Sequence, residues 1–158
     1  MNTLFETLHA TLDGYPRPDD LSVARVTKLV YLADWLHAIE RDCQITYIQW
    51  HFDNFGPFVW DVKNCARDHP DTFAIQNTNT PFGTPKTTIT LKQSKRSAHL
   101  DREKTRIINS VRKKTSKKTW AEFIRTIYST YPIVTSDQYT DLDLVEKARE
   151  YRATKGEQ

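Results

Sequence analysis

The sequence predicts an α+β, mostly α fold: a compact helical domain with a short strand and a β-hairpin. Three observations predict it. Apolar residues recur at helical spacing in several segments, most regularly between about 20 and 40. Apolar and polar residues alternate in QITYIQWHF, residues 44–52, as in a half-buried strand. Two β-prone runs between 71 and 92 flank NTNTPFGTP, which predicts a hairpin with a long tip.

The first part of the chain is expected to place two helices before the strand. Residues 3–12 form a short amphipathic helix, which DGYPRPDD breaks. A short side-chain oxygen satisfies free N–H groups at a helix start, so Asp19 or Asp20 is the expected N-cap of the next helix, about 20–40. That helix is predicted to be central and buried, with an apolar side formed by Val26, Leu29, Val30, Ala33 and Leu36.

The strand is expected to lead through a sharp corner into another helix. Ile48, Trp50 and Phe52 alternate with polar residues and should point inward. Gly56 allows the turn, and Pro57 suits the first helical position, where no N–H is missed. The sequence therefore predicts a helix from about 57 to 69.

The second part of the chain is predicted to be helical after the hairpin. A helix starts at Ser97 and runs to about Lys113, and Thr119 with Glu122 matches a capping box for a helix that ends near Tyr131. YPIVTSDQY is expected to be a connector, and Thr140 with Asp143 opens a last helix. With 158 residues the chain is expected to form one domain, residues 1–152, followed by a frayed tail, 153–158.

Charge is distributed unevenly along the chain. Residues 92–118 contain eleven Lys and Arg but two acidic residues, whereas the rest contains twelve basic and eighteen acidic residues. Such a basic segment is either a solvated helix face or a docking patch for nucleic acid or an acidic protein surface. The candidate docking patch consists of Arg112, Lys113, Lys114, Lys117 and Lys118.

The motifs of several functional classes are missing from the sequence. It contains no HExxH, paired CxxC, GxGxxG, P-loop or GxSxG, so no enzyme activity, cofactor or metal is expected. Cys43 and Cys65 do not form a disulfide framework. No apolar run approaches the roughly 20 residues of a membrane span, and the N-terminus does not resemble a signal peptide. A cytoplasmic protein without membrane contact is the expectation.

Two kinds of macromolecular binding remain. Helix, strand, helix and hairpin together resemble part of a winged helix, which would bind DNA. The helix after Pro57 carries Asp61, Asp68 and Asp71, however, and these oppose a polyanion. Protein binding is favoured by the aromatic stretch FDNFGPFVW, residues 52–60, because Trp, Phe and Tyr are enriched at interface hot spots.

The order of residues in VTKLVYLADWLHAIERDCQITYIQWHFDNFGPFVWDV resembles the signature of the SocA-like antitoxin domain, also called the Panacea domain. The resemblance consists of a Lys-Leu-x-Tyr helix, a short strand and an aromatic stretch that ends in Gly-Pro-hydrophobic. Phe58 and Trp60 depart from it, because smaller aliphatic residues are more usual there. The motif positions expected to be structural are Lys28, Leu29, Tyr31, Gly56 and Pro57.

This resemblance implies an antitoxin of a type II toxin–antitoxin pair, which neutralises a cognate, translation-inhibiting toxin by direct contact. Some family members deliver the toxin to a protease. The alternatives are a winged-helix-like DNA-binding regulator and an orphan interaction module, such as a phage protein or a proteolytic adaptor. The partner contact is expected on the aromatic corner or the hairpin tip, with these candidate residues: Trp50, Asp53, Asn54, Phe55, Phe58, Trp60 and Phe82.

Overall fold

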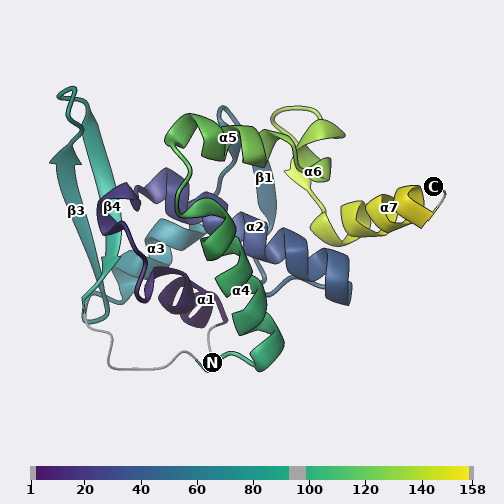
Figure 1. Ribbon diagram of the computed structural model, residues 1–158, viewed down its shortest axis with the longest axis horizontal. Helices are drawn as coiled ribbons and strands as arrows, with labels where there is room; N and C mark the ends of the chain where they lie inside the picture. Colours follow the sequence, from purple (N-terminus) through teal and green to yellow (C-terminus); the bar gives the residue numbers. More distant parts are fainter. Residues whose placement is uncertain (1–2, 93–98, 157–158) are drawn as a thin grey trace.

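The computed structural model describes residues 3–92 and 99–156. It has the predicted α+β, mostly α architecture, with one long helix at the centre and two small antiparallel sheets (Figure 1). In chain order the elements are α1 (Thr3–Leu12), η1 (Pro18–Asp20), α2 (Val23–Arg41), β1 (Trp50–Asp53), β2 (Gly56–Pro57), α3 (Asp61–Asp68), β3 (Phe73–Asn79), β4 (Pro85–Leu91), α4 (Arg102–Thr115), α5 (Trp120–Tyr128), α6 (Tyr131–Val134), β5 (Asp141–Leu142) and α7 (Leu144–Gly156).

Helix α2 is central and buried, as predicted. It packs against α1, α3, α4 and α7, so side chains on most of its circumference are buried. Its N-cap is Ser22, whose hydroxyl accepts a hydrogen bond from the backbone N–H of Arg25 at 3.1 Å. The predicted cap at Asp19 or Asp20 is wrong, because both residues lie in the 3-10 turn η1 that precedes the helix.

Strand β1 is the middle strand of a three-stranded sheet with the order β2-β1-β5. Ile48, Trp50 and Phe52 are buried, as the alternation predicted. Pro57 does not open a helix: it lies in β2 opposite Phe52, and α3 begins only at Asp61. The sequence predicted neither β2 nor β5, because two-residue strands carry no periodic signal.

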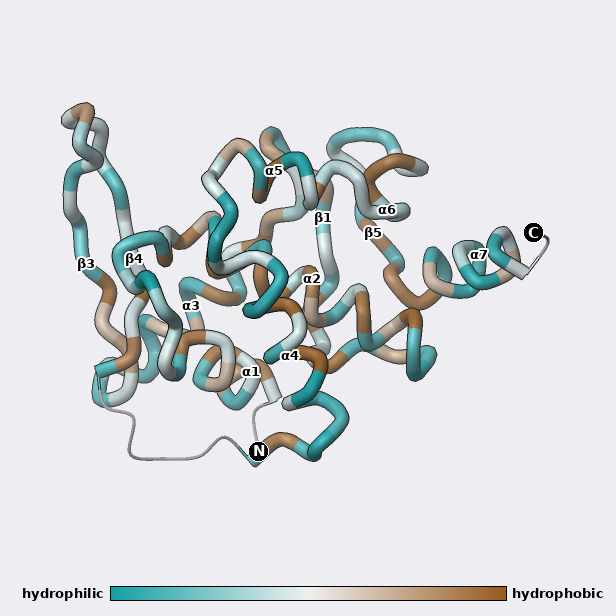
Figure 2. Tube along the Cα trace, viewed as in Figure 1, coloured by the Kyte–Doolittle hydropathy of each residue, from teal (hydrophilic) through white to brown (hydrophobic). Residues whose placement is uncertain are grey.

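The predicted hairpin is present as β3 and β4, paired in register from Phe73 opposite Leu91 to Asn79 opposite Pro85. It projects from the body of the molecule (Figure 1), and its base is attached by a hydrogen bond of 2.9 Å from Ile89 N–H to Leu21 C=O. In Figure 2 the strands are hydrophilic toward the tip, whereas the tip itself contains a hydrophobic stretch.

The helices predicted for the second half of the chain are present, but they differ from the prediction at their ends. The predicted start at Ser97 lies outside the described residues, and α4 is capped by Asp101, which accepts from Lys104 N–H. The capping box of Thr119 and Glu122 at α5 is confirmed. The expected connector contains α6, and α7 continues to Gly156, into the segment assigned to the tail.

Candidate partner-binding groove

A groove of about 690 Å³ lies between the corner that follows β1 and the helix α5. Four separate segments form it: the start of α2, the end of β1 with its turn, the residues between β2 and α3, and one face of α5. The lining residues are Ala24, Lys28, Asp53, Asn54, Phe55, Phe58, Trp60, Trp120, Ile124 and Tyr128.

Aromatic side chains line this groove and remain accessible to solvent. Phe55 is 76% exposed and Trp60 is 61% exposed. The rings of Phe58 and Trp60 meet edge to face with centroids 5.0 Å apart, which fixes their orientation. Trp120 and Tyr128 are exposed on the opposite wall. An exposed aromatic surface of this kind is a candidate interaction site.

Gly56 makes the corner that brings the two walls together. Its φ of +101° is in the left-handed region that favours glycine. A Cβ there would lie 3.5–3.6 Å from Ile127, Tyr128 and the Cε of Lys28, in contact with both α5 and α2. These are ordinary van der Waals distances, so the positive φ of the turn, rather than lack of space, is what favours glycine at position 56.

Lys28 forms the floor of the groove. The residue is 1% exposed, and its Nζ lies 5.6 Å from the centroid of the Phe58 ring. Burial lowers the pKa of the Lys28 ammonium to about 8, and the negative charge of Asp53 only partly opposes this effect. Lys28 was expected to be structural; the structure places it in the candidate site as well.

The structure brings together five of the seven predicted partner-binding residues. Asp53, Asn54, Phe55, Phe58 and Trp60 all line the groove. Of these, Asn54 is held by a hydrogen bond that its Oδ1 accepts from the Tyr139 hydroxyl.

Trp50 does not belong to the candidate surface. It is fully buried, its indole Nε1 donates to Asp34 at 2.9 Å, and its ring meets Tyr31 edge to face at 5.5 Å. A side chain without solvent access cannot contact a partner, so its assignment as a contact residue is wrong. The strand alternation already predicted that it points inward.

Phe82 lies on a second, neighbouring surface. It is 95% exposed at the hairpin tip and lines a cavity of about 630 Å³ between the tip and the start of α5. Trp120 lines both this cavity and the groove, so the two surfaces adjoin. Arg25 is buried beneath this cavity, where it donates to the carbonyl oxygens of Thr115 and Lys118, both at 3.0 Å.

The candidate basic patch divides into two kinds of residue. Arg112 is half-buried and donates to the carbonyl oxygen of Ala10 at 3.1 Å, so it stabilises the end of α1. Lys113, Lys114 and Lys117 are exposed at the C-terminal end of α4, where they are free to attract an acidic partner.

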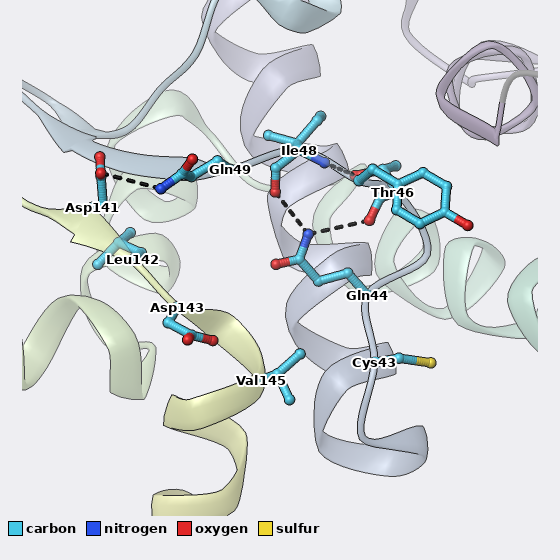
Figure 3. A pocket seen from close by; sticks show the side chains of 10 residues that line it. Cys43, Gln44, Thr46, Ile48, Gln49, Asp141, Leu142, Asp143 and Val145 are labelled. Carbon is cyan, nitrogen blue, oxygen red and sulfur yellow. Dashed lines mark hydrogen bonds between the residues drawn. The ribbon is translucent and has the colours of Figure 1, made fainter.

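A further cavity, of about 490 Å³, lies between residues 43–49 and the β5–α7 segment (Figure 3). The two side-chain amides of its lining are already bonded within the chain: Gln44 Nε2 donates to the carbonyl oxygens of Thr46 and Ile48, and Gln49 Nε2 donates to Asp141. It therefore offers fewer unused donors to a ligand than the groove, where Lys28 has none of its N–H groups bonded in the described chain.

The sequence analysis missed the α5 wall of the groove. Phe123 and Ile127, four residues apart, face the core, whereas Trp120, Ile124 and Tyr128 form a second stripe with the same spacing. A helix with apolar residues on two adjacent faces has more apolar surface than one core contact covers. That pattern was visible in the sequence, although it did not reveal which surface the second stripe faces.

Two other classes of site find no support in the described parts of the chain. Residues 3–92 and 99–156 contain no group of three His, Cys, Asp or Glu side chains placed to hold a metal ion. Within the same ranges, no helix has the length and hydrophobicity needed to cross a bilayer. The winged-helix alternative remains a prediction. In it, α3 would be the recognition helix, and α3 exposes Asp61 and Asp68.

Comparison with known proteins gave one family. Residues 26–132 match the model of the antitoxin SocA-like family, Panacea domain. This range contains every groove residue except Ala24. Neither the comparison with curated proteins nor that with solved structures gave a match. Because the matched range covers more than half of the chain, the protein belongs to the antitoxin SocA-like family, whose members carry the Panacea domain.

Proposed function

We propose that this protein is the antitoxin of a type II toxin–antitoxin pair and that it neutralises a translation-inhibiting toxin in the cytoplasm by direct contact. The groove is the proposed contact surface. One observation carries the proposal: a groove of about 690 Å³ whose exposed rings, Phe55, Trp60 and Trp120, come from three separate segments of the chain.

Rings of this kind suit protein recognition because they bury a large area and lose little conformational entropy on binding. Two of the rings are in contact within the chain: Phe58 and Trp60 pack edge to face beside the turn at Gly56. An antitoxin that covers a toxin's active cleft needs no catalytic group of its own, and the family points to such a non-enzymatic role.

The proposal is tested by bacterial growth. The open reading frame adjacent to the gene is induced alone and together with this protein. We expect growth to stop in the first case and to recover in the second, and the two proteins to copurify. A harmless neighbour, or toxicity that persists, would refute the pair at this locus. Recovery without copurification would favour the DNA-binding alternative.

A further inference from the structure

Lys28 has donor capacity that the chain does not use. Its side chain is almost fully buried at the floor of the groove, yet its ammonium has no hydrogen-bond or ion-pair partner within residues 3–92 and 99–156. The Nζ of Lys28 lies over the face of the Phe58 ring, 5.6 Å from the ring centroid. An ammonium carries three N–H donors, and at Lys28 the chain leaves them facing the groove. They are therefore available to an acceptor that enters from outside the chain.

The groove and its rim carry more positive than negative charge. Asp53 is the one carboxylate among the groove residues, and it is too distant from Lys28 to form an ion pair. Tyr128 is the other titratable group of the lining. Lys63 of α3 adds a second positive charge at the rim, where its Nζ lies 5.6 Å from the Trp60 ring centroid. An incoming carboxylate would balance this surplus.

We infer that the groove binds a toxin segment in which an Asp or Glu side chain is flanked by apolar residues. The carboxylate accepts hydrogen bonds from Lys28, and the flanking side chains pack on Phe55, Trp60 and Trp120. The inference rests on the proposed function and narrows it to one chemistry of the partner segment.

Two physical reasons favour this occupant. A charge-assisted hydrogen bond is stronger than a neutral one, and here aromatic rings exclude water around it. A groove of about 690 Å³ has the size of a pocket that holds a few side chains. A nucleic acid fits less well, because its row of phosphates would meet the carboxylate of Asp53 at the rim.

Binding should depend on pH through Lys28. In the free protein the pKa of Lys28 is about 8, and a bound carboxylate raises it. Complex formation above pH 8 therefore takes up a proton, and affinity falls as pH rises, by up to about tenfold per pH unit. The K28M variant should lose this dependence. Y128F should keep it, and D53N should move it to lower pH, because removing the Asp53 charge lowers the pKa of Lys28 further.

The first experiment uses a displayed library of random 12-residue peptides with the full chain as bait. Wild type should enrich peptides in which Asp or Glu adjoins aromatic or aliphatic residues. K28M should lose the acidic enrichment and bind a selected peptide about tenfold or more weakly at pH 7. The inference would be overturned if the peptides selected by the wild-type protein contained no acidic residues. It would also be overturned if K28M selected the same peptides as wild type, or if no peptide were enriched at all.

A second measurement does not depend on a variant that folds. NMR titration of the lysine side chains follows the pKa of Lys28 in the wild-type chain with a selected peptide and with its Glu→Gln or Asp→Asn form. The acidic peptide should raise that pKa and the amide form should not. Equal effects of the two peptides would contradict a carboxylate on Lys28.

The growth assay separates the inference from the proposed function. Rescue by wild type but not by a folded K28M supports both. Rescue by wild type and equally by K28M leaves the antitoxin function in place and overturns the role of Lys28. Failure of wild type to rescue refutes the antitoxin function, whatever peptides the groove selects.

Discussion

Asp34 of α2 accepts a hydrogen bond of 2.9 Å from the indole Nε1 of Trp50 in β1. The same carboxylate accepts from the backbone N–H of Thr46 at 2.9 Å and from the Thr46 hydroxyl. Asp34 is fully buried, and burial raises its pKa while these hydrogen bonds oppose the rise. This cluster ties the central helix to the strand that leads into the groove, so Trp50 supports the binding surface from within.

The W50F variant should be destabilised. It removes one donor to Asp34 and leaves a small cavity, and we expect the free energy of unfolding to fall by about 2–4 kcal/mol. Urea denaturation measures the change. W120F is the matched control, because Trp120 is exposed and its substitution should change stability by less than about 0.5 kcal/mol. Equal effects of the two substitutions would contradict the structural role of Trp50.

The F55A and W60A variants should impair toxin binding rather than folding. Truncating such a ring is expected to weaken the complex by about 1–2 kcal/mol, which is roughly five- to thirtyfold in Kd. Calorimetry or growth rescue would detect the loss. Tyr47 is the control: it is 97% exposed but lies outside the groove, so Y47A should bind as wild type does. An equal loss in Y47A would place the contact elsewhere.

The K28M variant should be more stable than wild type near neutral pH. The pKa of Lys28 is about 8 in the folded chain and near 10.5 when unfolded, so folding disfavours the charged form. The cost is complete below pH 8, on the order of 3 kcal/mol, and disappears as pH rises toward 10.5. We expect the stability difference between K28M and wild type to shrink over this window.

Urea denaturation of both proteins at several pH values between 7 and 10 measures that difference. Burial also raises the pKa of Cys65 to about 11 and raises the pKa of Tyr31. Both groups are present in wild type and in K28M, so their contributions to stability cancel in the difference between the two proteins. A difference that does not change with pH would mean that Lys28 is not desolvated as the groove geometry requires.

Charge reversal at Lys113, Lys114 and Lys117 should slow association with an acidic toxin. Exposed charges steer encounter, so we expect the on-rate at low salt to fall by about tenfold while the off-rate stays the same. Stopped-flow kinetics at several salt concentrations test this. R67E, a reversal on the exposed side of α3, is the control. A wild-type on-rate that is independent of salt would refute steering by this patch.

Arg112 should behave differently from its three neighbours. Because it donates to the Ala10 carbonyl at the end of α1, R112A should lower the unfolding free energy by about 1–2 kcal/mol. Thermal denaturation measures this, and the on-rate of folded R112A should remain near that of wild type. A slower on-rate with unchanged stability would place Arg112 in the docking patch after all.

The sequence by itself determined the central helix, the hairpin and the capping box of α5, because each depends on neighbours within a few residues: helical spacing, alternation around a turn, and Thr119 with Glu122. It also indicated the family through the order of residues between 26 and 62. These signals depend on residues that are close together in the sequence, so they can be read without knowledge of the tertiary structure.

Only the tertiary structure decided which of those residues form a surface. Trp50 and Trp60 were both candidate contact residues, yet Trp50 is buried against Asp34 and Tyr31 while Trp60 is exposed in the groove. Lys28 and Trp120 are 92 positions apart in the sequence, and the fold places both in the lining of one groove. Burial and the pKa of Lys28 follow from contacts between distant segments, and no local pattern encodes them.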